Sequence, residues 1–356
     1  MLTAFWNDVT NALLLNLELT MAGIRFNLTP QLPLTDLCTL AKWYQIENDH
    51  LVEQASESSQ LGEDFIVFFG AQADTQFLQS AIEFIGEANI NAVSLYQPAV
   101  QLAPALAFHV KAQFDDLKAY KKQLRSFAAE HGFEGAYLSK PASLSQPGLL
   151  IMDMDSTAIE IECIDEIARL ADVYDEVASV TAMAMAGQLG FSESLYQRVA
   201  KLEGIELSLI QQLKDNLPLM EGIQDLCHTL KVHNWQLVLA SGGFTWFAEA
   251  LQAPLSLDAF YANELEIKEA RLTGKVLGGV VDAQKKADIL AMTRTQLGFA
   301  KQQTIAIGDG ANDLVMMAEA GTGVAIHGKP KVVENADAAI CHGSLLQLLY
   351  FIALPK

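Results

Sequence analysis

Two aspartates close an apolar run near the middle of the chain, and a third carboxylate follows shortly after them. The stretch GLLIMDMDSTAIEIECIDE, residues 148–166, places Asp153 and Asp155 directly after GLLIM, and Glu162 nine residues after Asp153. Alternate residues of an extended segment face the same way, so the two Asp side chains share one side. An aspartate can attack a phosphoryl group and form an aspartyl-phosphate, while a second carboxyl protonates the leaving oxygen and later takes a proton from water. We assign the first role to Asp153 and the second to Asp155.

Crowded carboxylates repel one another, and this chain adds a further one. The segment GDGAND, residues 308–313, places Asp309 after another apolar run. A hard divalent cation with oxygen ligands would neutralise such a group. Mg²⁺ fits best, because it needs only a few protein oxygens and keeps water and substrate phosphate in its other positions. The sequence therefore predicts an Mg²⁺ site formed by Asp153, Asp155 and Asp309.

Two further features suit a phosphate group. In LASGGFT, residues 239–245, Ser241 can donate its hydroxyl, and Gly242 allows a backbone N–H to approach phosphate oxygens. Lys286, beside Lys285 at the start of a predicted helix, adds a positive charge. Taken singly, each of these motifs is ordinary turn or surface sequence, and only their ordered combination indicates a catalytic site.

The elements that must position these residues are short apolar runs. They read GLLIM, WQLVLA, QTIAIG, TGVAIH and ADAAIC, and helical stretches separate them. This alternation is typical of an α/β fold with a Rossmann-like parallel sheet and helices on both faces. Ligands of such sheets bind at the carboxyl ends of the strands, where the candidate residues stand. We also expect a helical cap at about residues 165–220, inserted after the first strand, and a β-hairpin within residues 262–279.

In this order, Asp-x-Asp-x-Thr, Ser-Gly-Gly, a helix-borne Lys and Gly-Asp-Gly-x-Asn-Asp resemble the motifs of the haloacid dehalogenase (HAD) superfamily of phosphohydrolases. The resemblance implies that Asp153 is the nucleophile and a metal ligand, and that Asp155 is the acid/base whose backbone carbonyl also binds the metal. Asp309 is implied as the remaining ligand, with Asp313 behind it and Thr157 fixing the turn. The residues implied to hold the phosphate are Ser241, Gly242, Lys286 and Asn312. Met154 departs from the pattern, which commonly has an aromatic residue there.

The similarity extends over nearly all of residues 148–345, through DMDSTAIEIECIDEIA, LASGGF, ANELEI, TGKVLG and VVDAQKKADIL, to superfamily members that hydrolyse O-phosphoserine. It implies that Glu162 pairs with the ammonium group of the substrate and that Arg198 grips its carboxylate. A zwitterionic head group needs one anion and one cation, and Arg binds a carboxylate with a planar fork. Met185 and Phe191 match apolar cap residues that close over the site. The implied reaction is the Mg²⁺-dependent last step of serine biosynthesis.

The N-terminal part has a different pattern. Within residues 63–140 the predicted elements run βαββαβ, the order of a ferredoxin-like α+β fold. This order resembles an ACT domain, a regulatory module of amino-acid metabolism, and implies pairing in a homodimer. A Pro- and Gly-containing polar stretch then reads as a linker. We expect an N-terminal domain at 1–140, a linker at 141–148 and a phosphatase domain at 149–356.

Composition excludes several classes of partner. The formal net charge is −20, whereas nucleic acid and anionic membrane surfaces need a basic footprint. The four cysteines are scattered without a metal-binding or disulfide spacing, and we expect free thiols in a cytoplasmic protein. Two alternatives stay open at this point. One is a phosphatase for another small phosphomonoester, such as phosphohomoserine or phosphothreonine, and the other is a non-catalytic, amino-acid-binding regulator.

Overall fold

The computed structural model describes residues 17–20, 23–28, 31–47, 50–53, 63–111 and 114–355, and the predicted domain at 1–140 also contains residues that lie outside these ranges. The chain forms two compact units. One contains Met1–Pro141 together with Leu349–Lys356, and the other contains Ala142–Leu348. In the described part of the chain, no helix has the length and apolar character needed to cross a membrane.

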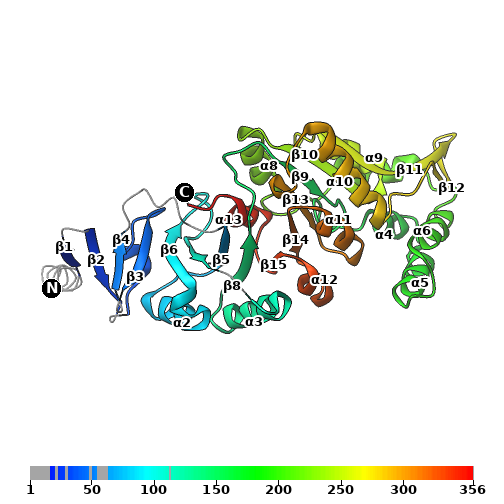
Figure 1. The fold of residues 1–356 in the computed structure, drawn as a ribbon. Coiled ribbons are helices and arrows are strands. Elements are labelled where there is room, and N and C mark those ends of the chain that lie inside the picture. Colours follow the sequence, from blue (N-terminus) through cyan, green and yellow to red (C-terminus); the bar gives the residue numbers. More distant parts are fainter. Residues whose placement is uncertain are drawn as a thin grey trace, which may run out of the picture. The chain divides into compact units, whose positions relative to one another are not determined.

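The second unit is built on a seven-stranded sheet (Figure 1). Its strand order is β12-β11-β10-β9-β13-β14-β15. All neighbouring strands run parallel except β11 and β12, which are antiparallel. This confirms the predicted Rossmann-like sheet. The strands are β9 (Leu149–Met152), β10 (Gln236–Phe244), β11 (Ala259–Lys268), β12 (Arg271–Leu277), β13 (Thr304–Gly308), β14 (Thr322–Ile326) and β15 (Ala338–Ile340).

Helices cover both faces of this sheet. Ile151 of β9 packs in a cluster with Leu290, Met316 and Val332 from helices α10, α11 and α12. Right-handed crossovers place α8 and α9 on the opposite face, because β9, β10 and β11 advance in the other direction across the sheet. The helices are α8 (Ile223–Val232), α9 (Thr245–Gln252), α10 (Ala283–Leu297), α11 (Leu314–Glu319) and α12 (Pro330–Asn335), with 3₁₀ turns η3 (Lys301–Gln303), η4 (Ala311–Asp313) and η5 (Leu345–Leu348).

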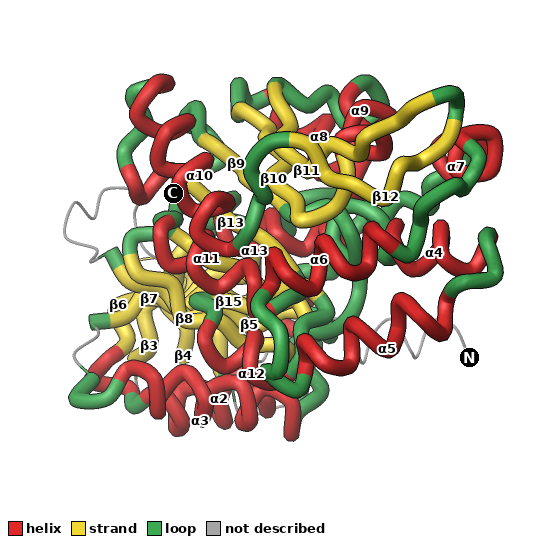
Figure 2. Tube along the Cα trace, turned by 90° about the vertical axis from the view of Figure 1, so that its right-hand side faces the viewer, coloured by secondary structure: helices red, strands yellow, loops and turns green. Residues whose placement is uncertain are grey.

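A helical cap lies between β9 and α8, as predicted. It contains α4 (Cys163–Leu170), α5 (Tyr174–Met185), α6 (Phe191–Ala200) and α7 (Leu207–Asp215). Figure 2 shows α5 and α6 running side by side, and the two helices are in contact. The expected hairpin is formed by β11 and β12. Glu269 and Ala270 both have positive φ angles, of 50° and 57°, which is the backbone of a two-residue type I′ turn.

The first unit has the predicted βαββαβ order. β6, β7, β5 and β8 are neighbours in one sheet, all antiparallel, which is the split arrangement of a ferredoxin-like fold. The resemblance to an ACT domain stays a prediction. Its elements are β5 (Asp64–Phe69), α2 (Thr75–Ile85), η2 (Glu87–Asn89), β6 (Ile90–Tyr96), β7 (Ala105–Val110), α3 (Leu117–Glu130) and β8 (Glu134–Ser139). The sheet continues beyond β6 through β3 (Trp43–Glu47), β4 (His50–Glu53), β2 (Gly23–Asn27) and β1 (Leu17–Thr20), and η1 (Leu34–Asp36) precedes β3.

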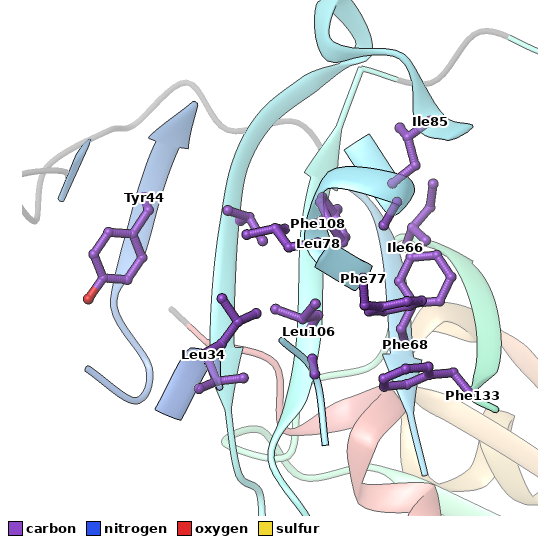
Figure 3. Packing of buried hydrophobic residues seen from close by; sticks show 14 of the residues in the cluster. Leu34, Tyr44, Ile66, Phe68, Phe77, Leu78, Ile85, Leu106, Phe108 and Phe133 are labelled. Carbon is purple, nitrogen blue, oxygen red and sulfur yellow. The ribbon is translucent and has the colours of Figure 1, made fainter. Parts of the chain in front are cut away.

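Aromatic rings dominate the core of the first unit. Phe77 of α2 stacks on Phe133 with 3.8 Å between ring centroids, and its edge-to-face neighbour Phe68 comes from β5 (Figure 3). The C-terminal helix α13 (Leu349–Ile352) joins this unit, because its Tyr350 ring packs on Phe69 with 5.0 Å between centroids. The predicted bounds of the phosphatase domain, 149–356, include these residues. Burial of their aromatic side chains instead places them with the first unit.

All four cysteines are thiols, as expected. Cys38, Cys163 and Cys227 are buried, and Cys341 is half-buried. Burial raises the pKa of Cys38 and of Cys227 to about 12. Thiolate is the reactive form of cysteine, so these two side chains act as small apolar residues of the core.

Candidate active site

The carboxyl ends of the parallel strands bring the candidate residues to one cavity. Asp153 follows β9 directly and is only 5% exposed, and Ser241 stands in β10. The cavity has a volume of about 240 Å³. Nine predicted residues line it, namely Asp153, Asp155, Glu162, Phe191, Arg198, Ser241, Gly242, Asp309 and Asn312.

Lys286 lies beneath the cavity and bridges two carboxylates. Its Nζ is 2.7 Å from Asp153 Oδ2 and 2.7 Å from Asp313 Oδ1. Asp282 caps α10 by accepting a bond from the Lys285 N–H, and the helix then directs Lys286 inward and leaves Lys285 exposed. Burial acts to lower the pKa of the Lys286 ammonium group, but the charges of Asp153 and Asp313 outweigh it and raise this pKa. Lys286 therefore stays charged in the core.

Asp153, Asp309 and Asp313 form an acidic group suited to a metal ion. Each offers a carboxylate oxygen, and these oxygens all lie within 4.8 Å of one another. Burial, followed by the negative charge of Asp153, raises the pKa of Asp309 and of Asp313 to about 7. One ammonium group does not balance three carboxylates, and oxygen donors at this spacing fit a divalent cation. Asp313, predicted to stand behind the ligands, contributes a carboxylate to this group, and the predicted metal contact of the Asp155 backbone carbonyl stays a prediction.

The Asp155 carboxyl group points to the start of the cap. Its Oδ1 accepts a hydrogen bond of 3.1 Å from the Cys163 N–H, the first residue of α4. Burial, then the charges of Glu162 and Asp153, raises the pKa of Asp155 to about 8. A carboxyl group with this pKa holds a proton near neutral pH and can donate it. A Cβ atom on Gly243 would lie 2.5 Å from Asp155 Oδ2, so the glycine permits this close approach.

The C-terminal end of β10, after Ala240, presents donors for an anion. Ser241 is fully buried, and its Oγ accepts a 2.9 Å hydrogen bond from the Gly243 N–H. Because the hydroxyl oxygen is held in this way, its own hydrogen points elsewhere and can be donated to a ligand. Thr157 is also buried, and its Oγ1 lies 3.5 Å from Asp309 Oδ1.

The cavity lining also contains one carboxylate, Glu162, and one guanidinium group, Arg198. Glu162 Oε1 accepts a 2.9 Å bond from Ser156 Oγ. Glu162 is partly open to solvent, but its partial burial in the wall raises its pKa. Burial lowers the pKa of Arg198. Within the described residues, the buried Arg198 Nε has no hydrogen-bond partner, which leaves a donor for a ligand.

Of the two apolar cap residues predicted to close over the site, only one lines the cavity. Phe191 lines the cavity, whereas Met185 is not among its lining residues and its side chain is 71% exposed. The cavity is also lined by Ile164 and Leu195, which were not predicted, and by Gly243, Phe244 and Gly310, which belong to the predicted strand-end segments but had no role assigned. Helical spacing was a usable signal for Leu195, since it stands four residues after Phe191 and three before Arg198 on the same face of α6.

The fold and the site define a class of protein. A sequence model of haloacid dehalogenase-like hydrolases matches residues 148–321, which include strands β9 to β13, the cap and the acidic group. The second unit is therefore a haloacid dehalogenase-like hydrolase. This agrees with the resemblance seen in the motifs.

Closer relatives narrow the class. The phosphoserine phosphatase of Vibrio cholerae serotype O1 is 53% identical over 197 residues, which cover 55% of this chain and 60% of that protein. The phosphoserine phosphatase of Haemophilus influenzae is 49% identical over 218 residues, covering 61% and 69%. The unliganded crystal structure of a probable phosphoserine phosphatase from Vibrio cholerae superposes with a TM-score of 0.67 at 36% identity, covering 89% and 95%. The chain belongs to the phosphoserine phosphatase family, and its aligned part spans less than two thirds of the first of these relatives.

Proposed function

We propose that this protein hydrolyses O-phosphoserine to serine and phosphate with Mg²⁺, through an aspartyl-phosphate on Asp153. One observation carries the proposal. A single cavity joins a buried Asp153, held by the Lys286 ammonium group, to the oppositely charged pair Glu162 and Arg198. Family membership supports the same substrate class. The reaction would be the last step of serine biosynthesis.

The mechanism divides one displacement into two. In the first step, Asp153 Oδ attacks phosphorus, a P–O bond forms to Asp153, and the bond to the serine oxygen breaks while Asp155 protonates that oxygen. In the second step, Asp155 takes a proton from water, which attacks phosphorus and releases Asp153 and phosphate. Ser241, Gly242, Asn312 and Lys286 hold the phosphoryl oxygens. Asp153, Asp309 and the Asp155 backbone carbonyl, with Asp313 behind them, would hold Mg²⁺, which would supply positive charge to neutralise the phosphoryl group.

Substrate selection rests on the head group. Glu162 pairs with the ammonium and Arg198 with the carboxylate, and their separation from Asp153 sets the length of the phosphomonoester that fits. Phe191 already lines the cavity. Met185, at the exposed end of α5, reaches the substrate only when that end of the cap moves toward the cavity, and we propose that substrate binding favours this closure.

Replacing the head-group residues tests this assignment. Glu162→Gln and Arg198→Lys should raise KM for O-phosphoserine by ~10- to 100-fold, because Gln lacks the negative charge that pairs with the substrate ammonium group and Lys lacks the planar fork that binds the substrate carboxylate. p-Nitrophenyl phosphate lacks that head group, so its hydrolysis should change little. Glu193→Gln, on the exposed face of α6, is the matched control. Phosphate release is measured over a panel of phosphoamino acids and sugar phosphates.

Two outcomes would count against the proposal. Preference for phosphohomoserine, phosphothreonine or a sugar phosphate would reject the substrate. No release of phosphate from any member of the panel, with Mg²⁺ present, would favour the non-catalytic regulator.

The acidic group predicts a pH-dependent response to Mg²⁺. The folded-state pKa values of Asp155, Asp309 and Asp313 are raised to about 8, 7 and 7, above the ordinary value of 3.8. The folded protein thus binds more protons than the unfolded chain, and its metal-free stability falls as pH rises from about 4 to about 8. Mg²⁺ offsets the emerging charge. The Mg²⁺-induced rise in Tm should be larger at about pH 8 than at about pH 6. An equal rise at both pH values would contradict Mg²⁺ binding by this acidic group.

Two broader proposals concern the setting of the enzyme. We propose a cytoplasmic location, on the ground that all four cysteines are thiols. We also propose that the first unit pairs in a homodimer, which rests on its ACT-like element order. A monomeric mass in sedimentation experiments would reject the second proposal.

A further inference from the structure

Asn263 of β11 is a buried side chain that joins two segments of the active-site wall. It is 1% exposed. Its Nδ2 donates a 2.8 Å hydrogen bond to the Gly242 carbonyl, and its Oδ1 accepts a 2.9 Å bond from the Val281 N–H. Only this orientation of the amide satisfies both partners, since a carbonyl needs a donor and an N–H needs an acceptor. Glycine and valine backbones lying 39 residues apart in sequence are thus held by one side chain.

The bond to Gly242 acts on Ser241 through a single peptide group. The carbonyl of Gly242 and the N–H of Gly243 belong to the same planar peptide. Asn263 holds its carbonyl end, and Ser241 Oγ accepts from its N–H end at 2.9 Å. The peptide plane is therefore fixed from both ends. Rotation of that plane would remove both bonds and release the Ser241 hydroxyl.

These bonds form a chain with one direction. Val281 N–H donates to Asn263, Asn263 donates to Gly242, and Gly243 N–H donates to Ser241. Aligned hydrogen bonds polarise one another, so each link strengthens the next. At the end of the chain, Ser241 lines the cavity, and its hydroxyl can donate its own hydrogen to a ligand there.

The bond to Val281 acts on the second phosphate-binding element. Val281 immediately precedes Asp282, the N-cap residue of α10, and Lys286 lies in the first turns of that helix. Asn263 therefore connects the start of the helix that carries Lys286 to the end of β10 that carries Ser241. The register of β11 against β10 shifts between Ala240 and Phe244, and the Asn263 side chain holds this irregular end of β10 in addition to the strand pairing.

We propose that Asn263 is a positioning residue for phosphate binding, which aligns the Ser241 hydroxyl and the Lys286 helix through this hydrogen-bond chain. The inference rests on the proposed function, because it assumes that these two elements hold the phosphoryl group. Asn263 does not line the cavity itself. Its effect therefore falls on phosphate affinity and on the phosphoryl-transfer step, with Glu162 and Arg198 left in place.

Two variants of Asn263 distinguish its hydrogen bond to Gly242 from its hydrogen bond to Val281. Asn263→Ala removes both bonds. Asn263→Asp keeps an acceptor for Val281 but places an oxygen against the Gly242 carbonyl, so the link to Ser241 is broken. Both variants should lower kcat/KM by ~10- to 100-fold and weaken binding of inorganic phosphate by a similar factor, because small misplacements of binding groups have effects of this size. Titration calorimetry with inorganic phosphate and Mg²⁺ measures the second quantity without turnover.

Thr304→Val is the matched control. Thr304 is buried in the same unit and also joins two backbone groups, since it accepts from the Gly321 N–H at 2.9 Å and donates to the Lys301 carbonyl at 2.6 Å. It stands at the opposite end of β13 from Asp309. Phosphate affinity in Thr304→Val should stay within ~2-fold of wild type even though its Tm falls.

Three outcomes would overturn the inference. Unchanged phosphate affinity in both Asn263 variants would reject any positioning role. A loss confined to Asn263→Ala would restrict the role to Val281 and reject the chain to Ser241. An equal loss in Thr304→Val would assign the effect to general destabilisation. Failure of the wild type to hydrolyse any phosphomonoester would instead overturn the proposed function, and the calorimetric comparison would still test the positioning of phosphate.

Discussion

Asp153→Asn should abolish phosphoserine hydrolysis, with a fall in kcat of ~10⁴-fold or more, since the amide cannot form the acyl-phosphate. The change is isosteric, and Lys286 keeps its 2.7 Å bond to Asp313. Asp153 is a cause of the raised pKa values of both Asp309 and Asp313. Removing its charge relieves repulsion, so we expect the variant to fold with a Tm close to that of wild type.

Trapping of the intermediate measures this prediction directly. Acid quenching during turnover of ³²P-labelled phosphoserine should leave label on the wild-type protein and none on Asp153→Asn. Asp288→Asn, on the exposed face of α10, is a matched control that should keep both the label and the rate. Turnover retained by Asp153→Asn would refute the covalent mechanism. Label on the variant would assign the nucleophile to another residue.

Lys286→Met should have the second largest effect, and it combines lost activity with lost stability. Methionine fills the space of the lysine stem but leaves Asp153 and Asp313 facing each other without the ammonium group. Breaking a buried ion pair from one side costs about 3–5 kcal/mol of unfolding free energy. The rate should fall by ~10³-fold, since Lys286 both orients the nucleophile and offsets developing negative charge.

The adjacent lysine provides the control for this variant. Lys285 is exposed on the same turn of α10, and Lys285→Met should change neither rate nor stability by a measurable amount. Denaturant unfolding and steady-state rates are compared for the two variants. A Lys286→Met protein of wild-type stability would contradict the burial of the ion pair. If Mg²⁺ restored full activity to it, the proposed role of Lys286 in binding phosphate would fail.

The parts of the site that were predictable from sequence share one property. Asp153, Ser241 and Asp309 each stand at the end of an apolar run, and parallel strands bring such ends together whatever the details of packing. The hairpin of β11 and β12 and the cap were predictable for similar reasons, because short-range pattern and segment length specify them. Lys286 was also named, although Lys285 beside it has the same chemistry. The face of α10 that packs on the sheet buries Lys286 and leaves Lys285 exposed.

Other features depend on partners that are distant in sequence. Asn263 becomes visible only when β11 brings it to the Gly242 carbonyl and the Val281 N–H. The C-terminal residues from Leu349 join the first unit because the Tyr350 ring packs on Phe69 there. No local sequence pattern predicts this contact. Met185 was predicted to lie at the cavity but is exposed. The position of a cap helix depends on its packing against other segments, which its own sequence does not specify.

Residue type and periodicity encode which side chains end each strand and on which face, so the candidate catalytic residues and the sheet that carries them were predictable from sequence. How these groups influence one another depends on the packed structure. It placed Asp313 within reach of Asp153 and Asp309, raised the pKa of Asp155 to about 8, and set Lys286 between two carboxylates. Such effects depend on burial and on distances of a few ångströms, and these exist only after distant segments have packed together.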